Sequence, residues 1–324
     1  MGMKWYVTRR IAWAVVVSVL IVSLTWGLIK LSPNPQVEQA VSNAVLNGQN
    51  PEEAREAIEQ RRGLDRPLWV QYKDFVLNVY TFNWGWSISR SEPVTQAVLS
   101  GLYYTAQYSV PWTLATVIFG PIIGLYAAAN QYGWRDHAAT AFSFFGFAIP
   151  NFFFGIILLL IFGVQLGWTP VIYNTDVAVF GLENVRQLVL PVFVLVTGSI
   201  GGTVIVARNE SAEYVDADFV KTARAKGVSR YKIFYNHILR PTLVPLSTTI
   251  VGQLIALFTG ASLLVEVVFG IPGLGLTIFN AILAQDPPLV LGITYVFAFI
   301  GVVSNLIQDL VYTVLDPRIS FDDR

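Results

Sequence analysis

Six stretches of the chain are long, apolar and free of charged side chains, and they constrain the fold more than any other feature. Each has about 20 residues or more, which is the helix length that crosses the hydrocarbon layer of a membrane. Hydrophobic residues make up 54% of the chain and charged residues 13%, a composition typical of membrane proteins. The sequence predicts an all-α integral membrane protein with six transmembrane helices, at 11–29, 102–129, 138–163, 188–207, 246–265 and 289–308.

The first apolar stretch follows Lys4, Arg9 and Arg10, an arrangement also found in secretory signals. Its apolar part is longer than the ~7–15 residues of a signal core, and no small-x-small cleavage site precedes the break at 32–35. We interpret it as a retained first helix. The chain has no cysteine, which excludes disulfides and thiolate metal sites.

Basic residues predict which loops face the cytoplasm. With six crossings the N-terminal tail, 130–137, 208–245 and the C-terminal tail share one side, which carries 13 Lys and Arg against eight on the other side. This bias predicts that both termini are cytoplasmic in a multi-pass protein of the cell (inner) membrane. The formal net charge of zero argues against a nucleic-acid partner.

The long outer segment, 32–97, contains the signals of a short helix. Asn50 is a suitable N-cap, Pro51 suits the first helical position, and Gly63 follows a last turn that contains basic residues. These signals predict a helix over 51–62. Within the apolar stretches, prolines such as Pro150 predict kinks.

Pairs of glycines four residues apart also occur in the apolar stretches, at Gly120/Gly124 and Gly198/Gly202. Small residues at this spacing allow membrane helices to approach closely.

The inner loop between the fourth and fifth apolar stretches predicts two helices joined at a glycine. Residues 215–226 have apolar and charged side chains on opposite helical faces. Gly227 is suited to the left-handed conformation that ends a helix, and Ser229 is placed to cap a second helix that runs to Leu239. The pair could lie on the membrane surface, but aromatic and basic residues on several faces of the second helix favour a groove in a partner protein.

Residues 219–228, Phe-Val-Lys-Thr-Ala-Arg-Ala-Lys-Gly-Val, with 237–245, His-Ile-Leu-Arg-Pro-Thr-Leu-Val-Pro, resemble the cytoplasmic EAA loop of ABC importer permeases. The similarity is to the dipeptide/oligopeptide (also nickel) branch and its first, B-type permease. Lys221 stands where the general EAA signature has its leading glutamate, and the closing proline is displaced to Pro241. Further fragments of the same family follow in order along the chain, at 63–72, 87–94, 266–275, 286–292 and 312–318.

The resemblance implies a type I ABC importer permease that forms half of a translocation pathway and binds no cofactor itself. ATP and Mg would be bound by two cytoplasmic ATPase subunits, since no phosphate-binding Gly-x-x-x-x-Gly-Lys-[Ser/Thr] motif occurs in the chain. The other implied partners are a homologous second permease, an extracytoplasmic substrate-binding protein and the lipid bilayer. The implied regions are a tail and first helix (1–31), an extracytoplasmic insert (32–97), a five-helix core with the coupling loop 208–245 (98–315) and a cytoplasmic tail (316–324).

Two groups of candidate site residues follow from this resemblance, and neither is catalytic. Glu266, at the outer end of the fifth stretch, is a candidate for the outer gate with Phe269, Pro272 and Gly273, because an acid at membrane depth is usually paired or functional. His137 and His237 lack neighbouring carboxylates, so no metal site is expected. The expected contacts with the ATPase are Phe219, Ala223, Arg224, Lys226, Gly227, Val228, Ser229, Arg230, Tyr231 and Phe234.

Two other classes of protein fit the sequence less well than an importer. A secondary transporter or channel driven by an ion gradient usually has ionisable groups near the membrane midplane, and the six stretches have none there. An intramembrane enzyme needs a nucleophile with a base, or paired acids at depth, and none is apparent. The substrate stays open among dipeptides, oligopeptides, nickel chelates and oligosaccharides.

Overall fold

The computed structural model describes residues 3–31, 33–259 and 263–315, so the predicted tail at 316–324 lies outside the described residues. Four helices in these ranges are long and apolar enough to cross a membrane, and two bent helix pairs bring the number of candidate crossings to as many as six. The four long helices are α1 (Met3–Leu31), α5 (Val94–Ala128), α8 (Leu182–Val215) and α14 (Pro287–Leu315).

The first bent pair lies in the region where the sequence predicted one transmembrane helix, 138–163, with a kink at Pro150. Helix α6 (Trp134–Ala148) ends before Ile149 and Pro150, and α7 (Asn151–Leu158) then continues into the π-helix η1 (Leu159–Gln165). The two halves are bent by 97°. Ile149 is extended, with φ −98° and ψ 124°, because a proline disfavours the helical conformation of the residue before it. The kink predicted at Pro150 is therefore a complete break.

The second bent pair lies where the sequence predicted the end of a helix at 265. Helix α11 (Arg240–Thr259) precedes it, and the predicted helix 246–265 crosses residues 260–262, which are not described. Helices α12 (Leu263–Phe269) and α13 (Leu274–Leu283) are bent by 88°. Gly270, with φ +66°, begins the turn between them. A second short helix, α13, thus occupies a region that the sequence analysis left without structure.

Helices α5 and α8 pack closely because glycines lie at their contact. A Cβ atom on Gly120 would lie 2.7 Å from the Cβ of Thr203, and one on Gly124 would lie 2.6 Å from the Cβ of Ala207. Both distances are shorter than van der Waals contact, so no larger residue fits. The close approach predicted from the Gly120/Gly124 spacing is confirmed. The second pair is on α8, where Gly202 lies under the ring of Phe147 of α6.

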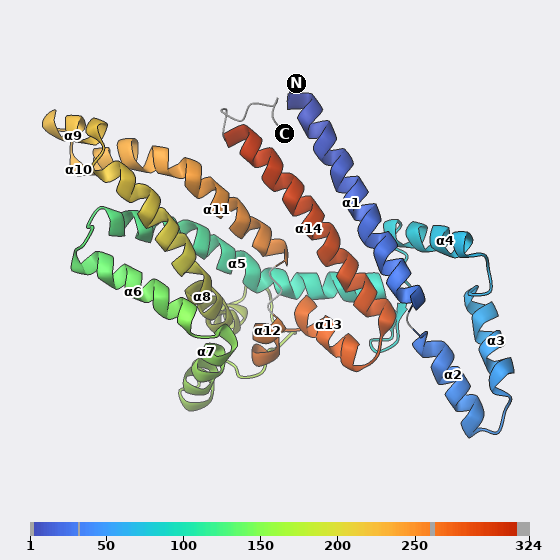
Figure 1. Cartoon of the computed structure of the whole chain (residues 1–324). Helices are drawn as coiled ribbons and strands as arrows, with labels where there is room; N and C mark the ends of the chain where they lie inside the picture. Colours follow the sequence, from blue (N-terminus) through green and yellow to red (C-terminus); the bar gives the residue numbers. More distant parts are fainter. Residues whose placement is uncertain (1–2, 32, 260–262, 316–324) are drawn as a thin grey trace.

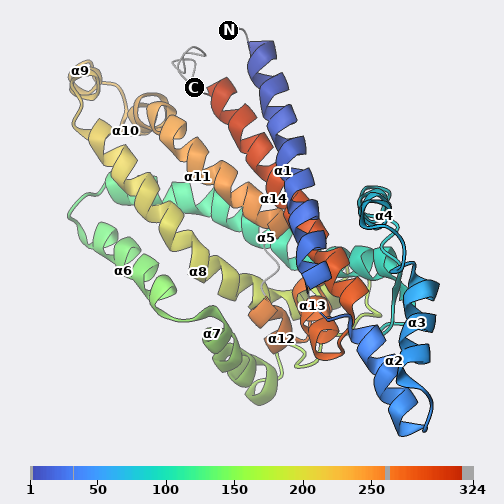
Figure 2. The ribbon, with the colours of Figure 1, turned by 45° about the vertical axis from the view of Figure 1, so that its right-hand side comes forward.

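The segment predicted to lie outside, which we continue to call the outer segment, forms α2 (Pro35–Leu46), α3 (Pro51–Arg62), α4 (Leu68–Tyr80) and the two short antiparallel strands β1 (Trp86–Ser87) and β2 (Glu92–Pro93). The prediction for α3 is confirmed: Asn50 Oδ1 accepts a hydrogen bond from the Glu52 amide at 3.0 Å, and Gly63 is left-handed. Figures 1 and 2 show α2 and α3 side by side, extending away from the long helices.

Helix α1 packs along α14, and α4 lies across α1. Arg10 and Asp309 form an ion pair of 2.8 Å between α1 and α14. In Figures 1 and 2 the start of α1, the end of α14 and the short helices α9 (Asp218–Ala225) and α10 (Arg230–Ile233) lie toward one end of the molecule. The bent pair α12–α13 lies toward the opposite end. We name these the α9 end and the α13 end.

Candidate functional site

The loop predicted to contact a partner forms two short helices at the α9 end of the molecule. Helix α8 ends at Val215, α9 follows after a break at Asp216 and Ala217, and Gly227 separates α9 from α10. Gly227 has φ +73°, the left-handed conformation that the sequence predicted. The first helix is shorter than the predicted 215–226, while the second continues without interruption through the π-helix η2 (Phe234–Leu239) into α11.

The two short helices share a small apolar core, which we call the loop core. It consists of Val220, Ala223, Ile233 and Ile238, all of which are buried. Ala223, predicted to contact the ATPase, is only 6% exposed, so it packs inside the loop. Its small side chain allows α9 and the following helix to lie together. The loop is therefore a folded unit with its own interior.

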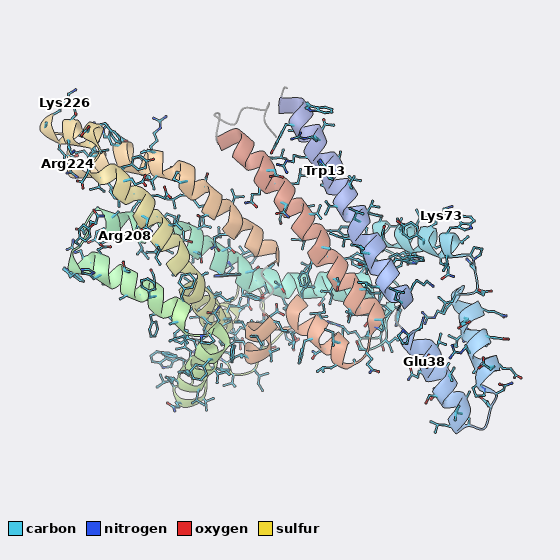
Figure 3. All side chains as sticks on the ribbon, in the orientation of Figure 1. Trp13, Glu38, Lys73, Arg208, Arg224 and Lys226 are labelled. Atoms are coloured by element: carbon cyan, nitrogen blue, oxygen red, sulfur yellow. The ribbon has the colours of Figure 1, made fainter. Side chains whose placement is uncertain are left out.

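The outer surface of the loop carries most of the other predicted contact residues. The Phe219 side chain is 47% exposed. Figure 3 shows Arg224 and Lys226 at the outermost part of the α9 end. Arg224 also donates a hydrogen bond to the Val215 carbonyl at 3.2 Å. Ser229 and Gly227 are exposed, Val228 and Phe234 are partly buried, and the side chains of Arg230 and Tyr231 lie outside the described residues.

A cavity of about 390 Å³ lies between the loop and the end of α5. Ala129, directly after α5, lines one side of it, and residues of the loop line the rest. The cavity is mostly apolar, and Arg224 is the charged residue among those that line it. The lining residues are Ala129, Val215, Arg224, Val228, Ile233, Phe234 and Ile238.

An ion pair that the sequence analysis missed joins α6 to α8 near this loop. The Arg208 guanidinium donates to Asp136 with Nε–Oδ1 of 2.6 Å and a second bond to Oδ2 of 2.7 Å. The Tyr132 amide also donates to Asp136 Oδ2, at 2.9 Å. Asp136 is 1% exposed, so this bidentate pair is largely shielded from water. In the sequence, this pair could have been suspected only from an acid in the first turn of α6 and an arginine directly after an apolar stretch.

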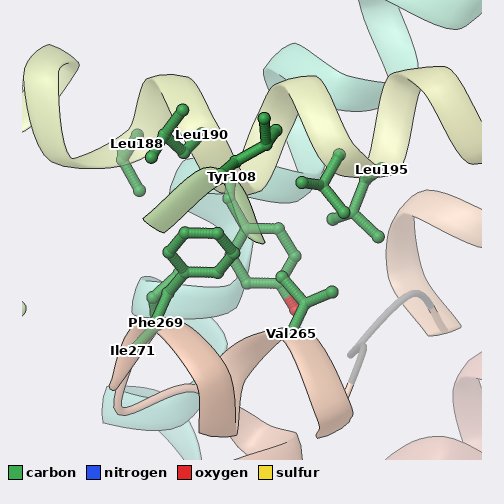
Figure 4. Close-up of a cluster of buried hydrophobic side chains, with 9 residues drawn as sticks. Tyr108, Leu188, Leu190, Leu195, Val265, Phe269 and Ile271 are labelled. Carbon is green, nitrogen blue, oxygen red and sulfur yellow. The ribbon is translucent and has the colours of Figure 1, made fainter. Parts of the chain in front are cut away.

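The candidate gate residues lie together at the turn between α12 and α13. The Glu266 carboxylate is completely buried and accepts hydrogen bonds from α5 and from α13. Phe269 packs in an apolar cluster around Tyr108 of α5 (Figure 4). Gly273 is the N-cap residue of α13. Pro272 is partly buried and lines a cavity of about 400 Å³ that Ser89 and Arg90 of the outer segment also line.

A second buried acid, Asp286, holds the outer segment against the helices. Its Oδ2 accepts from Ser87 Oγ at 2.7 Å and from the amide and hydroxyl of Ser89 at 2.9 and 2.8 Å. Burial favours the neutral carboxyl and acts to raise the pKa of Asp286, but the hydrogen bonds outweigh it and hold that pKa below its usual value. The two motifs noted separately at 87–94 and 286–292 meet at this contact.

These helices define an all-helical, multi-pass membrane protein with a folded polar loop at one end and a buried acid at the other. Residues 120–321 match the family described as "Binding-protein-dependent transport system inner membrane component". The chain belongs to this family of transport permeases, whose members are not catalytic enzymes.

Relatives match along nearly the whole chain. A putative peptide transport system permease protein of Brucella abortus (strain 2308) is 34% identical over 98% of this chain and 99% of its own length. The oligopeptide transport system permease protein AppB of Bacillus subtilis (strain 168) is 31% identical over 98% and 100%. The di/tripeptide transport system permease protein DppB of Pseudomonas aeruginosa is 31% identical over 97% and 98%. The resemblance to permeases of peptide ABC importers is thus confirmed.

Proposed function

We propose that this chain forms half of the translocation pathway of an ATP-driven importer of peptides or similar small solutes. Two findings support this function. The family is one of binding-protein-dependent transport, and the relatives described above are named for transport of peptides, oligopeptides or di- and tripeptides. Peptides are therefore the substrate class to test first.

The segment 215–239 is the part of this chain that couples transport to ATP hydrolysis. The observation that carries this assignment is the folded loop itself. Its apolar residues pack on one another in the loop core, while Phe219, Arg224 and Lys226 stay at the surface. A loop with its own core can transmit a displacement as a unit, and an exposed aromatic ring among basic residues suits a groove in a partner protein.

The assembly that follows has four kinds of component. This permease pairs with a homologous second permease, and two cytoplasmic ATPase subunits bind the loops and hold ATP and Mg. A substrate-binding protein delivers the solute from outside. Both termini and the α9 end are cytoplasmic in this arrangement, so α2, α3 and the α12–α13 turn lie at the extracytoplasmic side of six crossings.

Replacing Gly227 with valine tests the coupling role. Gly227 has φ +73°, and no atom of the described residues lies within 4 Å of an added Cβ, so a β-branched residue acts mainly through the backbone of the loop. We expect ATP-dependent uptake of a labelled tripeptide by the reconstituted complex to fall about tenfold or more, with normal membrane insertion. Gly48→Val is the matched control, because Gly48 is also left-handed, with φ +66° and open space around it, but lies between α2 and α3. Full uptake and full ATPase coupling in Gly227→Val contradict the assignment.

A carrier or channel driven by an ion gradient is the alternative function. The energy source that drives uptake distinguishes it from the ATP-driven importer. Proteoliposomes that contain the complex are supplied with ATP at zero ion gradient, or with a proton or sodium gradient and no ATP. Uptake that requires ATP supports the importer. Uptake driven by a gradient alone contradicts it.

A further inference from the structure

One carboxylate joins three helices at the α13 end. Glu266 of α12 accepts a hydrogen bond from Tyr108 of α5 at 2.7 Å and one from Thr105 of α5 at 2.9 Å, both through Oε1. Its Oε2 accepts from the amide of Leu276, in the first turn of α13, at 2.7 Å. Thr105 Oγ1 in turn accepts from the amide of Leu274 at 2.9 Å. We call these four hydrogen bonds the Glu266 clasp.

The clasp leaves no spare volume around the carboxylate. Gly273 precedes α13, and a Cβ atom at this position would collide with Glu266 Oε1 and lie 2.6 Å from Thr105 Oγ1. Gly273 has φ −78° and ψ −174°, an extended conformation that any residue adopts. The requirement for glycine is therefore steric. It places the first amide groups of α13 directly against the acid.

Filling space does not explain an acid at this position. A completely buried carboxylate loses its hydration, and an apolar side chain of similar size packs at lower cost. The carboxylate supplies acceptors for donors from two different helices and lies near the positive end of α13. Such an arrangement fixes the relative position of α5 and α13 through direction-dependent bonds.

Helix α5 also contacts the coupling machinery at its other end. Gly120 and Gly124 hold it close to α8, which is followed by α9 after the non-helical pair Asp216 and Ala217. Ala129, after the last turn of α5, lines the cavity beneath the loop core. The same continuous helix therefore contacts the Glu266 clasp near one end and borders the coupling loop at the other.

We propose that Glu266 is a positioning residue that ties the α12–α13 turn to α5, so that a movement of α5 opens or closes the outer side of the pathway. This role rests on the proposed function as an importer permease. The carboxylate does not contact the solute in this role. It makes the α12–α13 turn move together with α5, the helix that borders the ATPase-coupling loop.

The test uses the complete complex reconstituted in proteoliposomes, with a labelled tripeptide as the transported probe. Gly273→Ala introduces one methyl group into the clasp. We expect ATP-dependent uptake to fall about tenfold or more, because displacing hydrogen bonds to a buried charge costs enough for a change of that size. Complex assembly and basal ATPase activity stay close to the wild-type values. Gly301→Ala is the matched control, since a Cβ atom there has no atom of the described part of the chain within 4 Å, and it retains wild-type uptake.

A second substitution distinguishes the clasp from a general loss of structure. Glu266→Asp withdraws the carboxylate by one methylene and makes room for the methyl group of Gly273→Ala. We expect the double variant to transport about fivefold faster than Gly273→Ala alone, because the two residues are in direct contact and their effects are not additive. A double variant that is no faster than Gly273→Ala overturns the proposal.

A distance measurement detects the movement directly. The chain has no cysteine, so Leu99→Cys on α5 and Leu283→Cys on α13 introduce its two spin-label sites, both at exposed positions. We expect the label distance to be narrowly distributed in each nucleotide state and to broaden in Gly273→Ala. An unchanged distribution overturns the proposal, as does an equal loss of uptake, assembly and basal ATPase activity. Failure of ATP-dependent uptake in the wild-type complex overturns the proposed function itself.

Discussion

Ser87 Oγ donates a hydrogen bond of 2.7 Å to Asp286 Oδ2 across 199 residues of sequence. Asp286 lies between α13 and α14, and Ser87 is in β1 of the outer segment. The two hydrogen bonds from Ser89 reach the same carboxylate oxygen. The outer segment is thereby fixed beside the α12–α13 turn, where a binding protein would deliver the solute in the proposed importer.

The first prediction concerns pH. The pKa of Asp286 is lower in the folded protein than in the unfolded chain, so its ionised form stabilises the fold at pH values above the unfolded pKa of ~3.9. This contribution is lost as the pH falls through the folded pKa. Thermal unfolding of wild type and Asp286→Asn, measured from pH 7 to pH ~3, should show a difference in Tm that shrinks toward acid pH. A difference that does not depend on pH contradicts this prediction.

The second prediction concerns the ion pair between α6 and α8. Asp136→Ala leaves the partly exposed Arg208 guanidinium and the Tyr132 amide without their acceptor, and loss of a hydrogen bond to a charged group costs about 1.5–3 kcal/mol of folding free energy. Chemical denaturation in detergent measures this loss. Asp218→Ala is the control, because its pair with Lys221 is at the surface and its removal should leave stability unchanged. If the two substitutions lower the free energy of unfolding equally, the Asp136–Arg208 pair stabilises the fold no more than a surface ion pair.

The third prediction concerns the close contact of α5 and α8. Gly124→Ala places a methyl group against Ala207 and the Val204 carbonyl, and overpacking of this kind costs ~1–3 kcal/mol. Gly252→Ala is the control, since none of the described residues has an atom within 4 Å of its added Cβ. We expect a lower Tm in detergent for Gly124→Ala and no decrease for the control. If both variants have the Tm of the wild type, α5 and α8 can move apart without loss of stability, which contradicts the prediction.

The fourth prediction concerns the outer helix α3. Asn50→Ala removes the side-chain acceptor of the Glu52 amide, and the loss of an N-cap costs ~1 kcal/mol. Hydrogen exchange should become faster in the first turn of α3 and stay unchanged in α5 and α8. Since α3 has no buried residue, we expect no change in the global Tm. A lower global Tm would show that α3 supports the whole fold.

Structural features that depend on neighbouring residues can be predicted from this sequence. The bounds of α3 follow from Asn50, Pro51 and Gly63, which act on neighbouring amides, and the structure agrees residue by residue. The left-handed Gly227 is a local signal of the same kind. Hydropathy located the long helices, but it could not show that Pro150 divides one apolar stretch into two helices. Apolar composition alone does not specify whether the helix axis keeps its direction along the stretch.

The contacts that form the candidate site join residues far apart in the sequence, so patterns within one segment do not predict them. Asp136 and Arg208 are 72 residues apart, and each looks like an ordinary loop or helix-end charge in the sequence. Glu266 was singled out for its depth, while its donors Thr105 and Tyr108 lie inside an apolar stretch about 160 residues away. Ala223, expected at the ATPase contact, is buried in the loop core, and an amphipathic pattern does not distinguish the interior of a small loop from a binding face.

The two connections of the proposed coupling loop, 215–239, differ in structure. On one side, α8 and α9 are separated by the non-helical pair Asp216 and Ala217. On the other, α10, η2 and α11 run from Arg230 to Thr259 without a break. The loop is thus attached to α8 through a non-helical connection and to α11 through a continuous helix. Because α9 and α10 share the loop core, a displacement of the loop would tilt α11 with it, while the non-helical pair lets α8 keep its own direction.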